Sequence, residues 1–323
     1  MDRAAMDGAA LDSAAMSRAE TVVEFLRREQ VRLVGEFERI DDGGVFRQAP
    51  WSRSDLGKGT ARILERGRVF ERAGVNVSFV HGTRVPASIA DTQPSLAGRP
   101  FVATGISIVL HAVNPYTPSF HANFRYFEVG EESGTWWFGG GADMTPSYGF
   151  DEDAAHFHTT LKECCDRYDP EWYPVWKRAC DDYFYLPHRG EMRGVGGIFF
   201  DSLSDTDGVT WQRCFDFVRD GCAILVDAIE PIVARRSGIP YGDRERQWQL
   251  LRRGRYVEFN LVYDRGTRFG LQTRGNIEAI LMSMPAVASW AFDVRPEPDS
   301  PEGQTGRFLQ PTDWAAKGGR LPD

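Results

Sequence analysis

Residues 105–143 read GISIVLHAVNPYTPSFHANFRYFEVGEESGTWWFGGGAD, and this stretch contains the three runs that decide the fold. In each run apolar and polar side chains alternate, which is typical of a β-strand whose successive side chains point to opposite faces. The connection between the first two runs contains NPYTP and has the length of a long hairpin loop. The stretch therefore predicts neighbouring antiparallel strands.

Each run has one apolar face and one face with chemically active side chains. The second face collects, run by run, Ser107, Val109 and His111; His121, Asn123 and Arg125; and Trp137, Gly139, Gly141 and Asp143. A half-exposed sheet would have a polar face simply because water lies there, but such faces are usually rich in Lys, Glu and Thr. Histidine, arginine and aspartate beside glycines, which let a ligand approach the backbone, favour a binding site.

The composition is that of a globular protein. Of 323 residues, 42% are hydrophobic and 26% are charged, and a net charge of −8 argues against a nucleic-acid partner. No apolar run approaches the roughly 18 residues of a membrane span, so we expect no stable membrane insertion. Residues 1–20 mix acidic and basic side chains without an apolar core. We expect them to form a disordered or frayed tail of a cytoplasmic protein.

The numbers of cysteines and arginines indicate which kinds of site and ligand to expect. The five cysteines are odd in number and contain no CxxC pair, so we expect buried thiols rather than a disulfide framework or a zinc cluster. Arginine supplies nearly all of the positive charge, and its planar group suits carboxylate recognition. A genome-wide bias towards arginine codons is the alternative explanation.

Outside the central stretch, periodicity predicts both helices and strands. Helices are expected at 19–41, from 151 onward, and at 171–185, 211–236, 244–253 and 277–284; strands are expected within 60–80 and at 255–262 and 269–273. In the helix that begins at residue 151, His158 is expected to point inward and His156 outward. Together these elements predict a single α+β domain over residues 21–323, with helices packed on the faces of a large antiparallel sheet.

Five longer blocks carry a resemblance to a known family. They are FHANFRYF (120–127), WWFGGGADMTPSYGF (136–150), CDDYFYLPHRGEMRGVGGIFFD (180–201), RGRYVEFNLVYDRGT (253–267) and ILMSMP (280–285). In this order they resemble the oxygen-dependent coproporphyrinogen III oxidases, and the likeness covers nearly everything after residue 20. It implies oxidative decarboxylation of two propionates of coproporphyrinogen III to vinyl groups, which consumes O2 and yields protoporphyrinogen IX and CO2 in haem biosynthesis. No organic cofactor is implied.

The resemblance also implies an architecture and roles for individual residues. It implies a flat sheet between helices, and a homodimer with residues 256–290 at the interface. Asp143 matches the aspartate proposed to accept a pyrrole N–H proton, His121 matches the proton donor, and Arg125 completes the catalytic set. The implied substrate contacts are Ser107, Asn123, Phe124, Arg125, Arg193, Arg274, Gly275 and Asn276. The glycine triplet 139–141 would form a floor under the flat ring.

One short element departs from the family pattern. Members usually have Gly-Gly-Arg or Pro-Gly-Ser-Arg after the threonine that corresponds to Thr273, whereas this chain has Arg274-Gly275-Asn276. The arginine expected after the glycine stands before it. Which residue at 274–276 contacts a propionate is therefore open.

A divalent metal is the other open question. His111, His121, His158 and His188 match positions that bacterial relatives are thought to offer a metal, although other members work without one. Two further functions stay open. A tetrapyrrole-binding protein without catalysis would keep the arginines and glycines but could dispense with Asp143. A metal-dependent hydrolase or oxygenase would need the histidines around a single ion.

Overall fold

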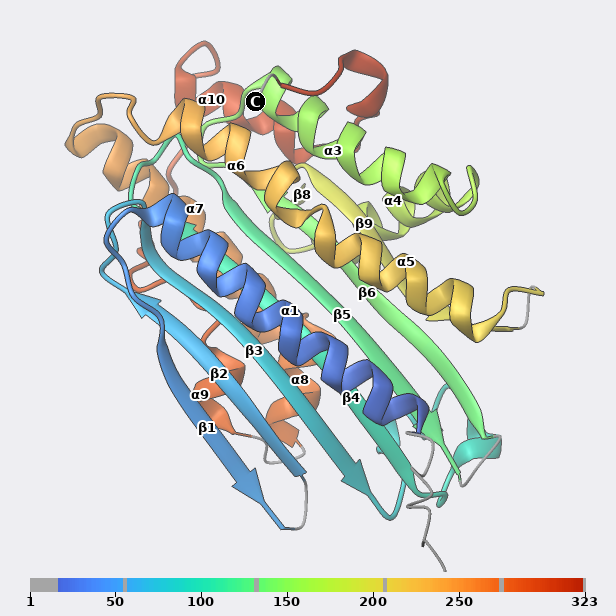
Figure 1. The fold of residues 1–323 in the computed structure, drawn as a ribbon. Coiled ribbons are helices and arrows are strands. Elements are labelled where there is room, and N and C mark those ends of the chain that lie inside the picture. Colours follow the sequence, from blue (N-terminus) through green and yellow to red (C-terminus); the bar gives the residue numbers. More distant parts are fainter. Residues whose placement is uncertain (1–16, 55–56, 131–133, 206–207, 273–275, 322–323) are drawn as a thin grey trace, which may run out of the picture.

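The structure is a computed structural model that describes residues 17–54, 57–130, 134–205, 208–272 and 276–321. Its centre is a seven-stranded antiparallel sheet (Figure 1). In spatial order the strands are β1 (Arg47–Arg53), β2 (Gly57–Glu65), β3 (Phe70–Gly82), β4 (Phe101–Ala112), β5 (Ser119–Val129), β6 (Thr135–Thr145) and β9 (Gly196–Leu203). A separate hairpin consists of β7 (Tyr185–Leu186) and β8 (Glu191–Met192).

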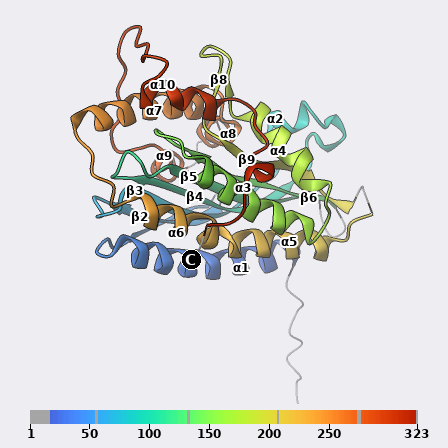
Figure 2. The same cartoon turned by 90° about the horizontal axis from the view of Figure 1, so that it is seen from above.

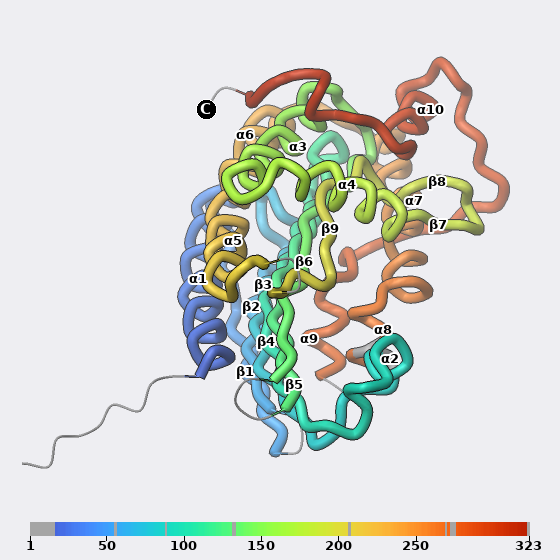
Figure 3. The backbone as a smooth tube through the Cα atoms, turned by 90° about the vertical axis from the view of Figure 1, so that its right-hand side faces the viewer, coloured from blue at the N-terminus to red at the C-terminus, as the bar shows by residue number. Residues whose placement is uncertain are grey.

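Helices cover both faces of the sheet. They are α1 (Arg18–Asp41), α2 (Ala87–Ala90), α3 (Asp151–Asp166), α4 (Trp172–Tyr183), α5 (Trp211–Ala223), α6 (Leu225–Arg236), α7 (Asp243–Val262), α8 (Arg265–Gln272), α9 (Ile277–Leu281) and α10 (Pro301–Gln304), with 3-10 turns at Pro94–Leu96, Thr305–Leu309 and Ala315–Lys317. Helices α1, α5 and α6 lie on one side, and α7, α8 and α9 lie on the other (Figures 2 and 3). The predicted α+β architecture is confirmed.

Helix α1 shows how the sequence builds the first of these layers. Ser17 and Glu20 form a capping box at its start, and both residues fall in the stretch predicted as a tail, most of which lies outside the described residues. The buried apolar stripe of α1 consists of Ala19, Val22, Val23, Leu26, Leu33, Val34 and Phe37. It packs on the apolar face of the central strands, and together they form the main hydrophobic core.

The register of the sheet sets the opposite, polar face. His121 lies opposite Val109 and Asp143, and Arg125 lies opposite Gly105 and Gly139. Cross-strand neighbours point to the same face, so the chemically active sides of the three central strands form one continuous surface. This surface faces the layer of α7, α8 and α9 (Figure 3). The strand predictions for residues 105–143 are confirmed.

Several element predictions are wrong. Residues 255–262 belong to α7, which is one helix over Asp243–Val262, and residues 269–272 belong to α8. The apolar alternation at 255–262 also fits a helix, because Tyr256, Phe259 and Asn260 are spaced by three and four and are all buried. The long helix expected at 211–236 is divided at Ile224 into α5 and α6.

His156 is a further correction. It is 2% exposed, although the helical wheel predicts an outward position. Its Nε2 lies 2.9 Å from the carbonyl oxygen of Asp227, and its Nδ1 accepts a hydrogen bond from the backbone N–H of Leu321. Helix α6 and the C-terminal segment thus cover a second side of α3. A helical wheel that assumes a single buried side does not predict this.

Two expectations drawn from composition can be compared with the structure. All five cysteines are free and buried, as expected. In the part of the chain that the structure describes, no helix is long and apolar enough to cross a membrane.

Candidate active site

The polar face of the sheet centres on three side chains. Asp143 on β6 faces His121 on β5, and the histidine Nδ1 lies 2.8 Å from Asp143 Oδ1. Arg193, in the segment after β8, donates from Nη2 to both carboxylate oxygens at 2.8 and 2.7 Å. The side chains of Asp143 and Arg193 are 3% and 2% exposed, whereas His121 is 16% exposed. Only the histidine of this trio reaches towards solvent.

The electrostatics of the trio define its protonation. Burial alone would raise the pKa of Asp143, but the charge of Arg193 and the hydrogen bond from His121 outweigh it and hold that pKa below its usual range. The carboxylate is therefore ionised at neutral pH and acts as an acceptor. Nδ1 of His121 must then be the protonated nitrogen, which leaves Nε2 as the nitrogen that can exchange a proton with a ligand.

Arg193 is enclosed on all sides. Its guanidinium carbon lies 4.1 Å from the ring centre of Phe184, 4.4 Å from that of Tyr256 and 4.9 Å from that of Phe259. Nη1 donates to Asn260 Oδ1 at 2.7 Å. Because this cation is stacked, paired and buried, it neutralises Asp143. The geometry gives no support to its predicted contact with a substrate propionate.

Arg125 is the cation that the site leaves accessible. It is exposed on the same face of β5 as His121, and none of the described residues forms a salt bridge with it. A side chain at Gly105 would place its Cβ 2.9 Å from Arg125 Cγ, so the glycine leaves room for the arginine. Arg125 is therefore free to bind a carboxylate.

A row of three polar side chains lies beside Arg125 on this face. Asn76 on β3, Ser107 on β4 and Asn123 on β5 are directly opposite one another. Oδ1 of Asn76 and Oδ1 of Asn123 are buried, and neither has a hydrogen-bond partner among the described residues. The two amides thus keep unused hydrogen-bonding capacity on either side of Ser107. Sequence reasoning misses Asn76, although its strand alternates and pairs with the strand of Ser107.

A comparison with known proteins gives the family of the chain. Residues 21–314 match the sequence model of the family described as coproporphyrinogen III oxidase. The chain belongs to this family. Its activity is the oxidative decarboxylation of coproporphyrinogen III in haem biosynthesis, and a tetrapyrrole with carboxylate arms fits a face that carries a free arginine.

A second carboxylate that sequence reasoning misses lies near His121. Asp264, at the junction of α7 and α8, accepts hydrogen bonds from the Tyr183 hydroxyl at 2.9 Å and from the Thr267 N–H at 2.6 Å. Burial alone would raise the pKa of Asp264. The Thr267 N–H and the charge of a protonated His121 have a larger, opposite effect, so the pKa of Asp264 lies below its usual range. In the sequence, Asp264 stands in Asp264-Arg265-Gly266-Thr267, which predicts only a turn. An imidazolium at His121 would therefore lie near two carboxylates.

The glycine triplet divides between the two faces. Gly139 and Gly141 lie on the polar face, whereas Gly140 lies opposite Phe124, whose side chain is 1% exposed in the apolar core. A Cβ at Gly140 or Gly141 would lie 2.4 or 2.2 Å from a backbone oxygen of the neighbouring strand. Close strand packing therefore explains these two glycines. Only the backbone of Phe124 is near the polar face, so its predicted substrate contact would have to be made there.

The four histidines of the predicted metal site do not surround one point. Three of them have both ring nitrogens engaged by other groups. His111 contacts Ser119 Oγ and the Ser283 carbonyl, and His158 contacts the Tyr173 hydroxyl and the Val195 carbonyl. His188 contacts the Tyr263 hydroxyl and the Glu258 carboxylate. Burial lowers the pKa of His111 and of His158 to about 3. Within the described ranges, no three His, Cys, Asp or Glu side chains gather around a possible ion. The donor set does not fit a shared metal ion.

The remaining predicted contact region is only partly described. Arg274 and Gly275 lie outside the described residues. Asn276 caps α9, and its side chain accepts a hydrogen bond from the Ala279 N–H at 2.9 Å. Its role towards a substrate stays a prediction.

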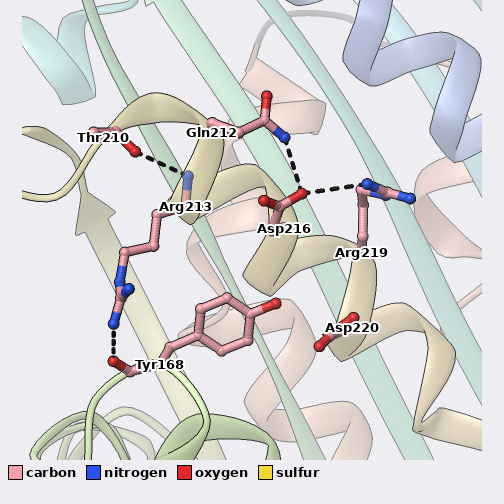
Figure 4. Close-up of a pocket in the computed structure, with 7 residues that line it drawn as sticks. All are labelled: Tyr168, Thr210, Gln212, Arg213, Asp216, Arg219 and Asp220. Carbon is pink, nitrogen blue, oxygen red and sulfur yellow. Dashed lines mark hydrogen bonds and ion pairs between the residues drawn. The ribbon is translucent and has the colours of Figure 1, made fainter.

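A hollow of about 450 Å³ lies away from these residues, beside the first turns of α5 (Figure 4). Its wall includes Arg213, Asp216, Arg219 and Asp220, and Asp216 pairs within the wall with Arg219. It contains none of the predicted site residues.

Proposed function

We propose that the chain carries out the family's decarboxylation with O2 as the oxidant, without an organic cofactor, at the pair His121 and Asp143. The observation that carries the proposal is the buried, ionised Asp143. Arg193 holds it from one side, and on the other side it orients a histidine that reaches the polar face. Such an arrangement is suited to moving one proton at a defined atom.

The reaction balances without a further redox partner. Each propionate, together with one O2 and one proton, gives a vinyl group, CO2 and hydrogen peroxide, so that oxygen takes up the two electrons that the side chain loses. Removal of a pyrrole N–H proton makes the ring electron-rich enough to react with O2 directly. The protein then has to bind the ring, accept that proton and shield the intermediate.

We assign the proton transfer to Nε2 of His121 rather than to Asp143 itself. Both oxygens of Asp143 already accept hydrogen bonds, its pKa is depressed, and its side chain is 3% exposed. All three properties make it a weak and poorly accessible base. Asp143 instead fixes the tautomer of His121 and stabilises the imidazolium after it takes the proton. Asp264 adds to that stabilisation.

Substrate binding follows from the rest of the face. Arg125 is the free cation for a propionate, because Arg193 is committed to Asp143. Asn76, Ser107 and Asn123 offer hydrogen bonds to the polar edge of the macrocycle, and Gly139 presents only backbone to its flat body. Arg274 and Gly275 remain candidates for a second propionate.

Exposed apolar side chains support a homodimer through residues 256–290. Within this range Leu261, Val262, Leu271, Ile277, Val287 and Trp290 are 42 to 57% exposed. Apolar side chains gathered in one segment are typical of a subunit interface. Sedimentation velocity on the protein and on a Leu261→Glu, Ile277→Glu variant tests this. A wild-type monomer would contradict the proposal.

The decisive experiment is an aerobic and an anaerobic assay with coproporphyrinogen III, in which the product is identified by mass. We expect loss of two CO2 equivalents only when O2 is present. Conversion at the same rate without O2 would contradict the proposed oxidant, and binding without conversion would indicate a binding protein instead. A parallel arm after chelation and metal analysis addresses the histidines, because full activity without metal ends the metal hypothesis.

A further inference from the structure

A second hollow, of about 230 Å³, lies outside the active site. The β7–β8 hairpin, the middle of α7 and the C-terminal segment 294–309 enclose it. Three of its lining residues are arginines: Arg189, Arg252 and Arg255. None of the catalytic or substrate-contacting residues discussed above lines it.

Arg252 has an incomplete set of partners. It is 6% exposed, and its Nη1 donates to Glu191 Oε1 at 2.7 Å. Nε and Nη2 are buried, and neither has a hydrogen-bond partner in the part of the chain that the structure describes. Buried charged donors without partners are costly, so this position favours an acceptor that a ligand would bring.

The two unpartnered nitrogens form a fork of the kind that binds oxyanions. Nε and Nη2 lie on one edge of a guanidinium and can donate in parallel. The same chain uses this edge elsewhere: Arg189 binds Glu258 through Nε and Nη2, and Arg236 binds Asp153 in the same way. At Arg252 the fork has no carboxylate from the described residues.

The charges around the hollow leave a positive excess. Glu258 is shared between Arg189 and Arg255, at 2.6 and 3.1 Å, and Glu191 pairs with Arg252. Burial and the nearby charge of Arg189 lower the pKa of Arg255. Glu302, which lines the hollow together with Glu191, is engaged by Arg244 and by the Tyr148 hydroxyl. Three cations therefore share two available carboxylates.

Part of the lining of the hollow is apolar. Trp248, Leu251 and Leu309 contribute to it, and Trp248 is fixed in place because its Nε1 donates to the Ser147 carbonyl at 2.7 Å. The volume lies below the range typical of sites for drug-sized ligands, which is about 300 to 1,000 Å³. A compact ligand with one charged end and one apolar end matches these walls.

We propose that this hollow binds a small organic anion, whose carboxylate or phosphate accepts from Nε and Nη2 of Arg252 while its apolar body lies against Trp248 and Leu251. Isothermal titration with phenylacetate and with phenyl phosphate, at constant ionic strength and neutral pH, tests the proposal. We expect saturable binding of at least one probe. The tighter probe shows which oxyanion the fork prefers.

Four variants locate the binding. Arg252→Gln should weaken it at least tenfold, because a fork of charged hydrogen bonds is lost. Arg252→Lys keeps the charge but loses the fork, and should also weaken it. Arg125→Gln removes the free cation of the active site, so it reports any probe bound there, and it should leave the binding that depends on Arg252 unchanged. The same holds for Arg235→Gln, a matched loss of charge at an exposed position on α6.

Three results would overturn the proposal: no saturable binding of either probe, loss of binding in Arg125→Gln but not in Arg252→Gln, or equal weakening in Arg235→Gln. Circular dichroism establishes whether each variant folds. If Arg252→Gln does not fold, Arg255→Gln at the rim replaces it, and unchanged affinity in that variant would count against the site.

Discussion

Two buried aspartate–arginine pairs in this chain look alike, and we propose different roles for them. Asp143–Arg193 lies on the polar face of the sheet, and Asp153–Arg236 joins α3 to α6. In the second pair Arg236 donates from Nε and Nη2 to the carboxylate at 2.7 and 2.8 Å, and its guanidinium carbon lies 3.6 Å from the ring centre of Phe150. Both arginines are buried against aromatic rings, and both aspartates are 3% exposed.

The third partner separates the two pairs. Asp143 also accepts from His121, whose side chain is 16% exposed. The third partner of the Asp153 pair is Glu152, a second carboxylate on Arg236. At Asp153 burial outweighs the arginine and raises the pKa, whereas at Asp143 the added histidine helps to lower it. We propose that this third partner, His121, gives the Asp143 pair a chemical role that the Asp153 pair lacks.

The largest expected effect is on turnover. Asp143→Asn should lower kcat by about 10³- to 10⁴-fold with little change in KM, because an amide cannot fix the His121 tautomer or stabilise an imidazolium. Steady-state kinetics with coproporphyrinogen III measures this. Asp153→Asn is the matched control and should keep kcat near the wild-type value. Equal loss in both variants would remove the distinction between the pairs.

The next effect is on stability. Asp153→Ala should lower the free energy of unfolding by about 3 to 5 kcal/mol, because it leaves Arg236 buried without its main counter-ion. Urea denaturation measures the change. The neighbouring Asp151, whose pairing with Arg307 is half-exposed, provides the control: Asp151→Ala should cost less than about 1 kcal/mol. Similar losses in both variants would mean that burial does not set the energy of the Asp153 pair.

A smaller effect concerns the exposed arginine that accompanies each pair. Arg125→Gln should raise KM about tenfold, near 1.4 kcal/mol, through loss of a charged contact to a propionate. Arg235→Gln, close to the Asp153 pair, should leave KM unchanged. An unchanged KM in Arg125→Gln, or a fall in kcat alone, would contradict the propionate role.

The two pairs should change the free energy of unfolding in opposite directions when the pH is lowered. The folded pKa of Asp143 is depressed, so its contribution to stability is present above the unfolded value near 4 and is lost as the pH falls. The folded pKa of Asp153 is raised, so its contribution grows on acidification and is lost as the pH rises through that pKa. Unfolding free energies of wild type, Asp143→Asn and Asp153→Asn from pH 3 to about 6 measure both slopes. Slopes of the same sign would contradict the assignment.

The central strands can be predicted from sequence because their alternation is long and their polar faces are chemically distinctive. The alternation alone places His121, Arg125 and Asp143 on the chemically active faces of their strands, and the register confirms that these faces coincide. Alternation of polar and apolar residues is a strong strand signal when three neighbouring runs show it. A shift of one residue in the strand register would move every polar side chain of a run into the core.

The companions of these residues cannot be predicted in the same way. The pairing of Arg193 with Asp143 joins positions 50 residues apart, and no local pattern encodes it. The run at 255–262 predicts a strand, because its eight residues alternate and include Tyr, Val and Phe. The same residues suit a helix equally well. Tertiary packing decides in favour of the helix, since only a helix brings Tyr256 and Asn260 to the same arginine.

The position of Asp143 opposite His121 also affects how the protein folds. If β6 slipped by one residue against β5, Asp143 would enter the apolar core beneath α1 and α5, and Arg193 would be buried without a counter-ion. Each error costs several kcal/mol, whereas many apolar contacts of a slipped strand would remain tolerable. The pair therefore disfavours misaligned sheets during folding, and a correctly aligned chain already holds His121 in the position that the proposed catalysis requires.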